Sequence, residues 1–409
     1  MTDKNRAMLL LVCNDHFTYY DASHRCILER LPFPVVVVTN RSSARYFAHL
    51  GSQVEVRVTS WGNFDNVRAD AHAIAKERPL FAIGTAAEGL LELAAELRHS
   101  LRIPGAMPEE VGRFRNKITM KQLLSTAGVR VPRFSLCSDR AEVYRLLSDH
   151  GKLVIKPVDG FGSRAVHFIE SVAELDDWYA KEKAEEFEAE EFIEGSLYHV
   201  NAVVREGQTI LVASALYLPG MANIDFSKGT PFATVLVPDS PLRDRLERFS
   251  QSVIEGLQLK NGVTHLECFL TQGGELVFCE IGARPGGGGI AQMIELQFGL
   301  DYVSATLLFQ AGMGAQIRVP PARSAGIMGL IGFRAASNCR PVSLAGPSDF
   351  PEDWIRFARH SKQPGQFIAA AKHCTDFICL LVFECDNEEH FRSRSMQLQD
   401  RFDSLLRLA

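Results

Sequence analysis

The sequence lacks the features that mark several common classes of protein. No apolar run reaches the about 18 residues that a membrane-spanning helix needs. The short apolar stretch near the N-terminus ends at the polar residues Asn14–His16, whereas a secretory signal needs a longer apolar core and a small-residue cleavage site. This stretch is therefore expected to be a buried strand. The net charge of −5 over 409 residues gives no electrostatic reason to expect nucleic acid or an anionic membrane as a partner.

The nine cysteines lack the spacing of a metal site or a disulfide framework. They are scattered along the chain without a CxxC pair, and several lie in apolar runs such as LVCN and LECF. Cysteines in such runs act as small hydrophobic residues. This pattern favours a reducing, cytoplasmic setting and argues against a zinc site.

Two common nucleotide-binding fingerprints are also missing. Asn14 and Asp15 follow the first apolar run, where a dinucleotide-binding domain would have glycines. The chain has no GxxxxGK[ST] motif either. A nicotinamide site or a P-loop is therefore not expected.

What the chain does have is three regions of different pattern. Residues 1–112 alternate short apolar runs (MLLLVC, VVVVTN, FAIGT) with helical stretches at 42–50 and 85–99. This alternation is typical of an open parallel α/β domain. Residues 113–190 contain a compact helix that ends at Gly128, a strand–glycine loop–strand unit and a charged helix over about 171–188.

Residues 191–409 predict a C-terminal α+β domain. A hairpin turns at Glu206–Gly207, and a helix over about 291–311 follows a second hairpin. The stretch 218–241 has few periodic features, and a long loop of this kind is usually functional or mobile. Candidate substrate contacts there and beyond, for which a solvated or structural role is the alternative, are Met221, Asn223, Asp225, Lys228, Arg323 and Arg334.

The second hairpin, THLECFLTQGGELVFCEIGARPGGGG, is the most informative stretch. Side chains alternate along a strand, so His265 and Glu267 face the same side. If the loop holds an even number of residues, His265 pairs with Glu280. Glu267 and Glu280 then lie diagonally on one face, about 7–8 Å apart at the backbone, where they can hold Mg²⁺. An odd loop would place them on opposite faces and remove the site.

An arginine and an anion-binding loop adjoin these acids. Arg284 follows Glu280 by four residues, and four consecutive glycines follow Pro285. A glycine run lets backbone N–H groups approach an anion closely. This combination suits phosphoryl transfer onto a carboxylate. The alternative is a surface hairpin with a flexible loop.

Two further motifs carry less information alone. Lys156 lies inside an apolar strand beside the glycine loop 159–163, where a charge is costly without a partner. Lys156 and this loop could bind a phosphate together, or they could be the end of an ordinary strand and its turn. The stretch EAEEFIEG is an acidic helix end joining a strand, or a functional segment.

Together and in this order, the motifs resemble the ATP-grasp superfamily over about residues 113–290. The family binds ATP between two α+β subdomains, one of them a mobile lid. The resemblance implies phosphate contacts for Lys117 and Lys156 and two metal-ligating acids, Glu267 and Glu280. It implies that Arg284 holds phosphate or acyl phosphate. The lid loop over the phosphates would then be formed by Gly160, Phe161, Gly162 and Ser163. The hinge that reads the adenine would be formed by Glu190, Glu191, Phe192 and Ile193.

Two positions depart from the family pattern. No acidic residue follows the hinge glycine to bind the ribose, so His199 is the candidate substitute. Gly282 stands where many members have an asparagine that contacts metal.

The form EIGARPGGGG, with HLE on the preceding strand, resembles the branch that contains the L-amino acid ligases. In that branch His265 and the glycine loop face the first substrate, which makes His265 and Arg284 the expected catalytic residues. The expected substrate contacts are these two and the glycines Gly286, Gly287 and Gly288.

The resemblance implies an ATP-dependent carboxylate–amine ligase that uses ATP with Mg²⁺ or Mn²⁺ and passes through an acyl phosphate. Its partners would be small carboxylates and amines, and a homodimer is the expected assembly. Alternatives are a purine-pathway carboxylase or transformylase, a biotin carboxylase-like enzyme, or a non-catalytic ATP-binding module.

Overall fold

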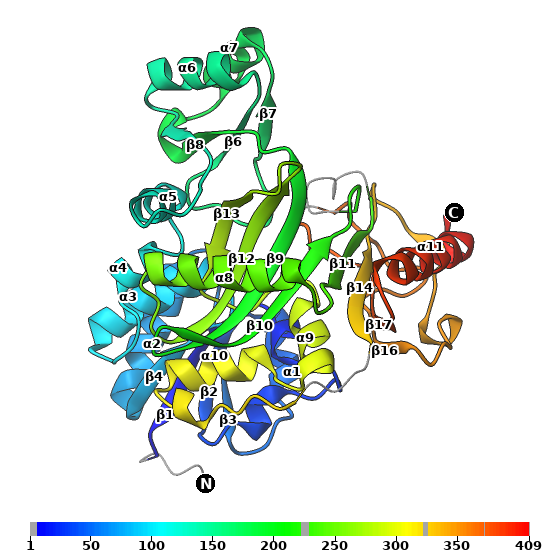
Figure 1. Ribbon diagram of the computed structural model, residues 1–409. Helices are drawn as coiled ribbons and strands as arrows, with labels where there is room; N and C mark the ends of the chain where they lie inside the picture. Colours follow the sequence, from blue (N-terminus) through cyan, green and yellow to red (C-terminus); the bar gives the residue numbers. More distant parts are fainter. Residues whose placement is uncertain (1–5, 222–228, 322–325, 372, 409) are drawn as a thin grey trace.

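The computed structural model describes residues 6–221, 229–321, 326–371 and 373–408 (Figure 1). Of the candidate substrate contacts, Asn223, Asp225, Lys228 and Arg323 lie outside these residues. The chain forms an N-terminal lobe, a small lobe at the top of Figure 1 and a large antiparallel sheet that spans the molecule. The predicted fold class, a parallel α/β domain followed by α+β parts, is confirmed.

The N-terminal lobe is a parallel sheet with strand order β3-β2-β1-β4. The helix predicted from Thr85 begins later, because the backbone N–H and carbonyl of Thr85 bind the side chain of Gln310 at 3.0 and 2.9 Å. The elements of this lobe are β1 (Met8–Cys13), β2 (Val35–Thr39), α1 (Arg41–Phe47), β3 (Val54–Val58), α2 (Phe64–Glu77), β4 (Leu80–Gly84), α3 (Leu91–Leu101) and α4 (Pro108–Gly112).

The small lobe is a four-stranded antiparallel sheet of order β5-β8-β6-β7. The helix predicted over 171–188 ends at Lys181, and residues 187–191 are a strand instead. The prediction was wrong because the acids of this segment are buried against lysines, as described below. The elements are β5 (Phe134–Leu136), α6 (Arg140–His150), β6 (Leu153–Pro157), β7 (His167–Ile169), α7 (Val172–Lys181) and β8 (Phe187–Glu191). The helix α5 (Lys117–Thr126) precedes them and packs Met120 and Leu124 into the core of the large sheet.

The large sheet has the order β13-β12-β9-β10-β11-β14-β17-β16. Its first hairpin turns at Glu206 and Gly207, as predicted, with positive φ angles of 53° and 82°. One of its strands, β11, lies within the stretch 218–241 that was expected to be a loop. The strands are β9 (Gly195–Arg205), β10 (Gln208–Tyr217), β11 (Phe232–Leu236), β12 (Gly262–Thr271), β13 (Leu276–Gly282), β14 (Ile327–Phe333), β16 (Ile355–His360) and β17 (Cys379–Cys385).

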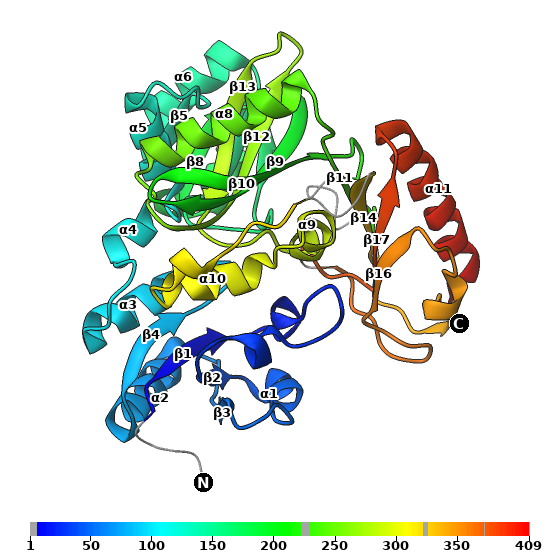
Figure 2. The same cartoon turned by 60° about the horizontal axis from the view of Figure 1, so that its bottom comes forward.

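Helices cover both faces of the large sheet. Side chains of α8 (Pro241–Gly256) and α11 (Glu388–Leu405) join the core on one face, and those of α9 (Ile290–Phe298) and α10 (Tyr302–Gln310) join the core on the other. Val303 and Leu307 of α10 also pack against the N-terminal sheet, so α10 joins the two lobes (Figure 2). The single helix expected over 291–311 is therefore two, separated at Gly299.

A short sheet pairs β15 (Pro341–Ser343) with β18 (Arg407–Leu408) near the C-terminus. None of the described helices is both long and apolar enough to cross a bilayer.

Candidate active site

A cleft of about 650 Å³ opens between the two lobes and the large sheet. The N-terminal lobe contributes the loop after β4, the small lobe contributes the loop 161–163, and the large sheet contributes the acidic hairpin. The glycines after β13 and the segment 373–378 complete the lining. The cleft thus brings together segments from most of the chain, as expected for a ligand site between lobes.

The acidic hairpin β12–β13 reaches the predicted arrangement by another route. Its turn is odd, because Leu270 pairs with Leu276, and on its own this register would place the glutamates on opposite faces. A β-bulge after Glu267 inserts one extra residue, Cys279, and restores the parity. Glu267 therefore pairs directly with Glu280 instead of diagonally, and His265 pairs with Gly282, so the predicted His265–Glu280 pair is wrong.

Glu267 is a buried carboxylate at the base of the cleft. The Tyr217 hydroxyl donates a hydrogen bond of 2.7 Å to its Oε1. Burial raises the pKa of Glu267, while Tyr217, Arg284 and Lys156 act to lower it. A buried carboxylate of this kind is stabilised by a bound cation.

The two paired acids fit a divalent cation that is shared with phosphates. No group of three or more His, Cys, Asp or Glu among the described residues forms a complete metal cage. Mg²⁺ is commonly held by only one or two carboxylates together with substrate phosphates. Glu267 and Glu280 meet that requirement.

Two lysines, Lys117 and Lys156, lie near these acids. Lys117 Nζ lies 3.5 Å from Glu280 Oε2 and donates to the Gly160 carbonyl at 2.5 Å. Lys156 Nζ lies 2.6 Å from Glu190 Oε1. Burial acts to lower the pKa of Lys156, but the charges of Glu190 and its neighbours together outweigh it, and the pKa lies well above its usual value.

A third lysine, which the sequence analysis did not identify, is fully buried and shares Glu190 with Lys156. Lys121 lies one helical turn after Lys117 and contacts Glu188 at 2.6 Å and Glu190 at 2.5 Å. The spacing of the two lysines on α5 and of the two acids on β8 could have indicated this cluster, because both pairs share a face.

Arg284 is held by an acid from the N-terminal lobe. Its Nε forms an ion pair with Glu88, which also receives Arg115 Nη1 at 2.9 Å. Burial acts to raise the pKa of Glu88, but Arg284 and Arg115 outweigh it, and the pKa is lowered overall. A Cβ placed on Gly282 would lie 2.6 Å from Glu88 Oε2, so Glu88 occupies the space beside the position where the family asparagine is absent.

A relay of hydrogen bonds fixes the orientation of His265. The Thr234 hydroxyl donates to the Leu216 carbonyl, so it accepts from His199 Nε2 at 2.8 Å. Asn201 Nδ2 then donates to His199 Nδ1, and His265 Nδ1 donates to Asn201 Oδ1, each at 2.8 Å.

With Nδ1 as the donor, the neutral form of His265 carries its lone pair on Nε2, which lies 3.6 Å from Glu267 Oε1. Burial lowers the pKa of His265 to about 3, with Arg284 acting in the same direction. His199 is fully buried with both ring nitrogens occupied, so the expectation that it binds the ribose is wrong.

The two glycine loops approach this centre closely. A Cβ on Gly286 would lie 2.9 Å from Asn201 Oδ1 and 3.0 Å from His265 Nδ1, so a side chain there would break the relay. Gly287 and Gly288 line the cleft beside it. In the lid, Phe161, Gly162 and Ser163 line the cleft from the other side.

The predicted hinge residues separate in space. Only Glu190 joins the lysines. Glu191 points to the opposite side of β8, where it contacts Arg130 at 2.7 Å and His150 at 3.2 Å. Phe192 is half-exposed against Phe168, and Ile193 is partly buried. An adenine contact by Glu191, Phe192 or Ile193 stays a prediction.

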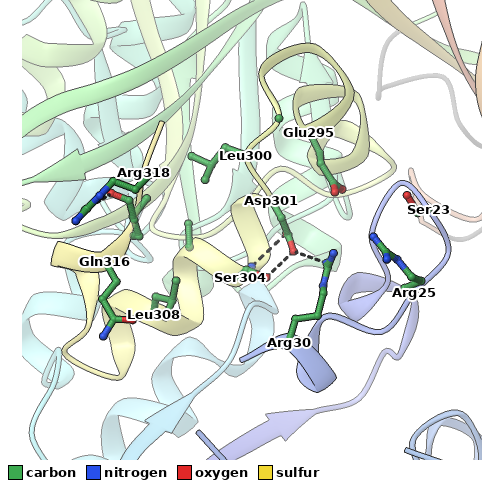
Figure 3. A pocket seen from close by; sticks show the side chains of 13 residues that line it. Ser23, Arg25, Arg30, Glu295, Leu300, Asp301, Ser304, Leu308, Gln316 and Arg318 are labelled. Atoms are coloured by element: carbon green, nitrogen blue, oxygen red, sulfur yellow. Dashed lines mark hydrogen bonds and ion pairs between the residues drawn. The ribbon is translucent and has the colours of Figure 1, made fainter. Parts of the chain in front are cut away.

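A second cavity, of about 340 Å³, lies where α9 and α10 meet the N-terminal lobe (Figure 3). Figure 3 shows Arg30 reaching Asp301, which caps α10, with Glu295 and Arg25 nearby. Glu295 Oε2 accepts the Ala22 N–H at 2.8 Å. These contacts join the lobes, so we assign this cavity a structural role.

Neither of the two described substrate candidates, Met221 and Arg334, is among the residues that line the cleft. Met221 packs against the core beside the start of β11, and its carbonyl accepts the Ala233 N–H at 2.9 Å. Arg334 directly follows β14 and is buried.

Comparison with known proteins places this geometry in a family. Residues 114–288, which span the lysines, the acids and most of the glycine loop, match the ATP-grasp domain. The chain carries an ATP-grasp domain.

Proteins of similar sequence and fold support this assignment. The L-arginine-specific L-amino acid ligase of Bacillus subtilis is 26% identical over 338 residues, which cover 79% of this chain and 78% of that protein. Dapdiamide A synthase of Enterobacter agglomerans is 26% identical over 239 residues, covering 54% of this chain and 55% of that protein. The crystal structure of an L-amino acid ligase from Bacillus licheniformis shares the fold with a TM-score of 0.77, 18% identity and 99% coverage of both chains.

Proposed function

We propose that the protein is an ATP-dependent carboxylate–amine ligase that forms an amide bond between small, amino-acid-like substrates. The observation that carries this proposal is the pair of opposed acids Glu267 and Glu280, which line the cleft with Arg284. Lys117 lies 3.5 Å from Glu280, the charge of Glu280 also acts on Lys156, and all of these residues fall in the segment that matches the ATP-grasp domain. The relatives whose names describe ligation of amino acids support the amine as acceptor.

The cations of the cleft suit the binding of phosphates. Lys117 and Lys156 approach from α5 and from the start of the lid, and the lid loop after Lys156 covers the cleft. Glu267 and Glu280 would hold Mg²⁺, which when bound neutralises the charge of the terminal phosphates. Little covalent chemistry then falls to the protein, because positioning and electrostatics supply most of the rate.

Arg284 is the residue that we assign to the substrate carboxylate. A carboxylate oxygen attacks the γ-phosphorus, the bond to the β–γ bridging oxygen breaks, and ADP leaves. An amine nitrogen then attacks the carbonyl carbon of the acyl phosphate, phosphate leaves, and the amine loses a proton. A closed lid loop keeps water from hydrolysing the intermediate.

Product analysis with purified protein tests this mechanism. We expect ADP and phosphate with a competent acid and amine, and a hydroxamate when hydroxylamine replaces the amine. Release of AMP and pyrophosphate would rule out the acyl phosphate. Turnover only with bicarbonate or formate would indicate another ATP-grasp chemistry, and tight ATP binding without turnover on any pair would indicate a binding module.

A further inference from the structure

Arg334 is a buried cation without a hydrogen-bond partner. Its side chain is 4% exposed, and none of its three guanidinium nitrogens has a partner among the described residues. Guanidinium groups carry five N–H donors and stay charged in proteins. Burial lowers the pKa of Arg334 to about 10. Cys374 and Asp376 act to raise it. Because no hydrogen bond from a described residue satisfies the guanidinium, its burial is costly unless a ligand binds it.

Two aromatic rings connect this charge with the cleft. The guanidinium carbon lies 5.6 Å from the ring centroid of Phe232 and 5.4 Å from that of Phe377. The two rings stack at 5.7 Å, and both line the cleft. An arginine over aromatic faces is a favourable arrangement. Its N–H groups point outward in the plane of the guanidinium and remain free to bind an anion.

The same wall continues to the acidic hairpin. The Tyr217 ring lies 5.5 Å from Phe232, and its hydroxyl binds Glu267. Cys374 also lines the cleft. Burial raises its pKa to about 12, while Arg334 acts to lower this pKa and Glu267 acts to raise it. A molecule lying along this wall could contact both Arg334 and the acidic hairpin.

We propose that Arg334 binds the carboxylate of the amine-bearing substrate, and that this substrate is an amino acid. The proposal rests on the proposed ligase function and adds the chemical class of the acceptor. A carboxylate offers two acceptor oxygens that match the guanidinium fork. The carboxylate to be activated must lie at Arg284, beside the phosphates. A second carboxylate held across two aromatic rings stays out of reach of the γ-phosphorus.

The experiment compares acceptors with and without a carboxylate, in wild type and Arg334→Gln. We expect the substitution to raise KM for an amino acid acceptor by about 100-fold, because it removes charge-assisted hydrogen bonds. The corresponding amino acid amide should be a poor acceptor for wild type and should be affected little by the substitution. Arg334→Lys should retain part of the discrimination, because it keeps the charge but loses the fork.

Hydroxylamine separates this inference from a structural role. It has no carboxylate, so hydroxamate formation should proceed at the wild-type rate in Arg334→Gln. A loss of hydroxamate formation would show that Arg334 serves the acid substrate or the fold, and would overturn the proposal. Thermal unfolding adds a second readout: removal of an unpaired buried charge should leave the melting temperature of Arg334→Gln unchanged or raised. A clear decrease would indicate a structural partner.

A matched control is Arg356→Gln, which removes an exposed arginine that pairs with Glu384 on the neighbouring strand. It should change neither the KM for the amino acid acceptor nor the KM for the amide acceptor. An equal KM for amino acid and amide acceptors in wild type would also overturn the inference while leaving the ligase intact. If wild type forms neither hydroxamate nor ligation product with any acid, the proposed function itself fails.

Discussion

The two regions that border the cleft, the phosphate end at the acidic hairpin and the aromatic wall of Phe232 and Phe377, hold their cations in opposite ways. At the phosphate end Lys117, Lys156 and Arg284 each face an acid, and the distances for the two lysines are 3.5 and 2.6 Å. At the aromatic wall Arg334 lies against Phe232 and Phe377 with no hydrogen-bond partner in the described part of the chain.

This difference indicates how each region meets its ligand. Paired charges keep the phosphate end close to neutral and pre-formed, so a phosphate with its metal ion exchanges one set of ion pairs for another. Burial of the guanidinium without a hydrogen-bond partner costs free energy, and a bound anion would remove that cost. Pre-formed ion pairs favour positioning, whereas an unpaired charge favours selectivity for one chemical group.

The largest effect should come from the acids of the phosphate end. Glu280→Gln removes one metal-ligating charge and should lower ligase turnover about 10³-fold or more. Phosphate release with a competent substrate pair measures this. Glu275→Gln, in the exposed turn of the same hairpin, is the control and should retain activity. Near-normal turnover of Glu280→Gln would refute the metal assignment.

The fully buried Lys121 offers the next test, which measures stability. Lys121→Met leaves Glu188 and Glu190 without their closest cation and should lower the free energy of unfolding by about 3–5 kcal/mol. Urea denaturation measures the change. Adding Glu188→Leu to the same variant should recover much of the loss, since the remaining acid, Glu190, still pairs with Lys156 at 2.6 Å. A single variant as stable as wild type would show that Lys156 alone compensates both acids.

Glu88 tests whether the distant acid positions Arg284. Glu88→Gln weakens the ion pairs to Arg284 and Arg115, and misplacement of Arg284 should reduce kcat/KM by up to about 100-fold. The KM for ATP should change less than that for the acid substrate. Glu92→Gln, a more exposed acid near Arg115, serves as the control. A fall in ATP affinity alone would place Glu88 at the nucleotide instead.

The smallest effect is expected outside the cleft, at Glu295, a partly buried acid. Burial raises the pKa of Glu295 from 4.5 to about 7. Its contribution to stability is therefore fully present below pH 4.5, decreases as the pH rises towards 7, and is lost above that value. Glu295→Gln should keep its bond to the Ala22 N–H and avoid this loss.

Melting temperatures measured across pH check this prediction. The variant and wild type should agree at pH 4, and the variant should melt about 2–4 °C higher at pH 8. A constant difference at all pH values would mean that titration of Glu295 is not the cause.

Several parts of the site could be predicted from the sequence because their signals are local. Alternating side chains identified Glu267 and Glu280, and an apolar strand around Lys156 indicated that this charge has a buried partner, which Glu190 supplies. The helix that ends at Gly128 and the turn at Glu206–Gly207 also follow from local rules.

Other parts could not be predicted, because they depend on segments far apart in the chain. Glu88 reaches Arg284 across 196 positions, and Tyr217 reaches Glu267 across 50. The strand β8 was assigned to a helix and a short segment, since its acids suit a strand only after α5 brings Lys121 beside them. The relay that occupies His199 likewise requires three adjacent strands.

The sequence by itself determined the kind of site: two acids, two lysines, an arginine and two glycine loops in ATP-grasp order. Only the tertiary structure decided how the acids meet. The odd hairpin would have separated Glu267 from Glu280, and the bulge at Cys279 brings them together. The tertiary structure also left Arg334 unpaired, because pairing of a buried charge depends on which distant side chains folding brings within reach.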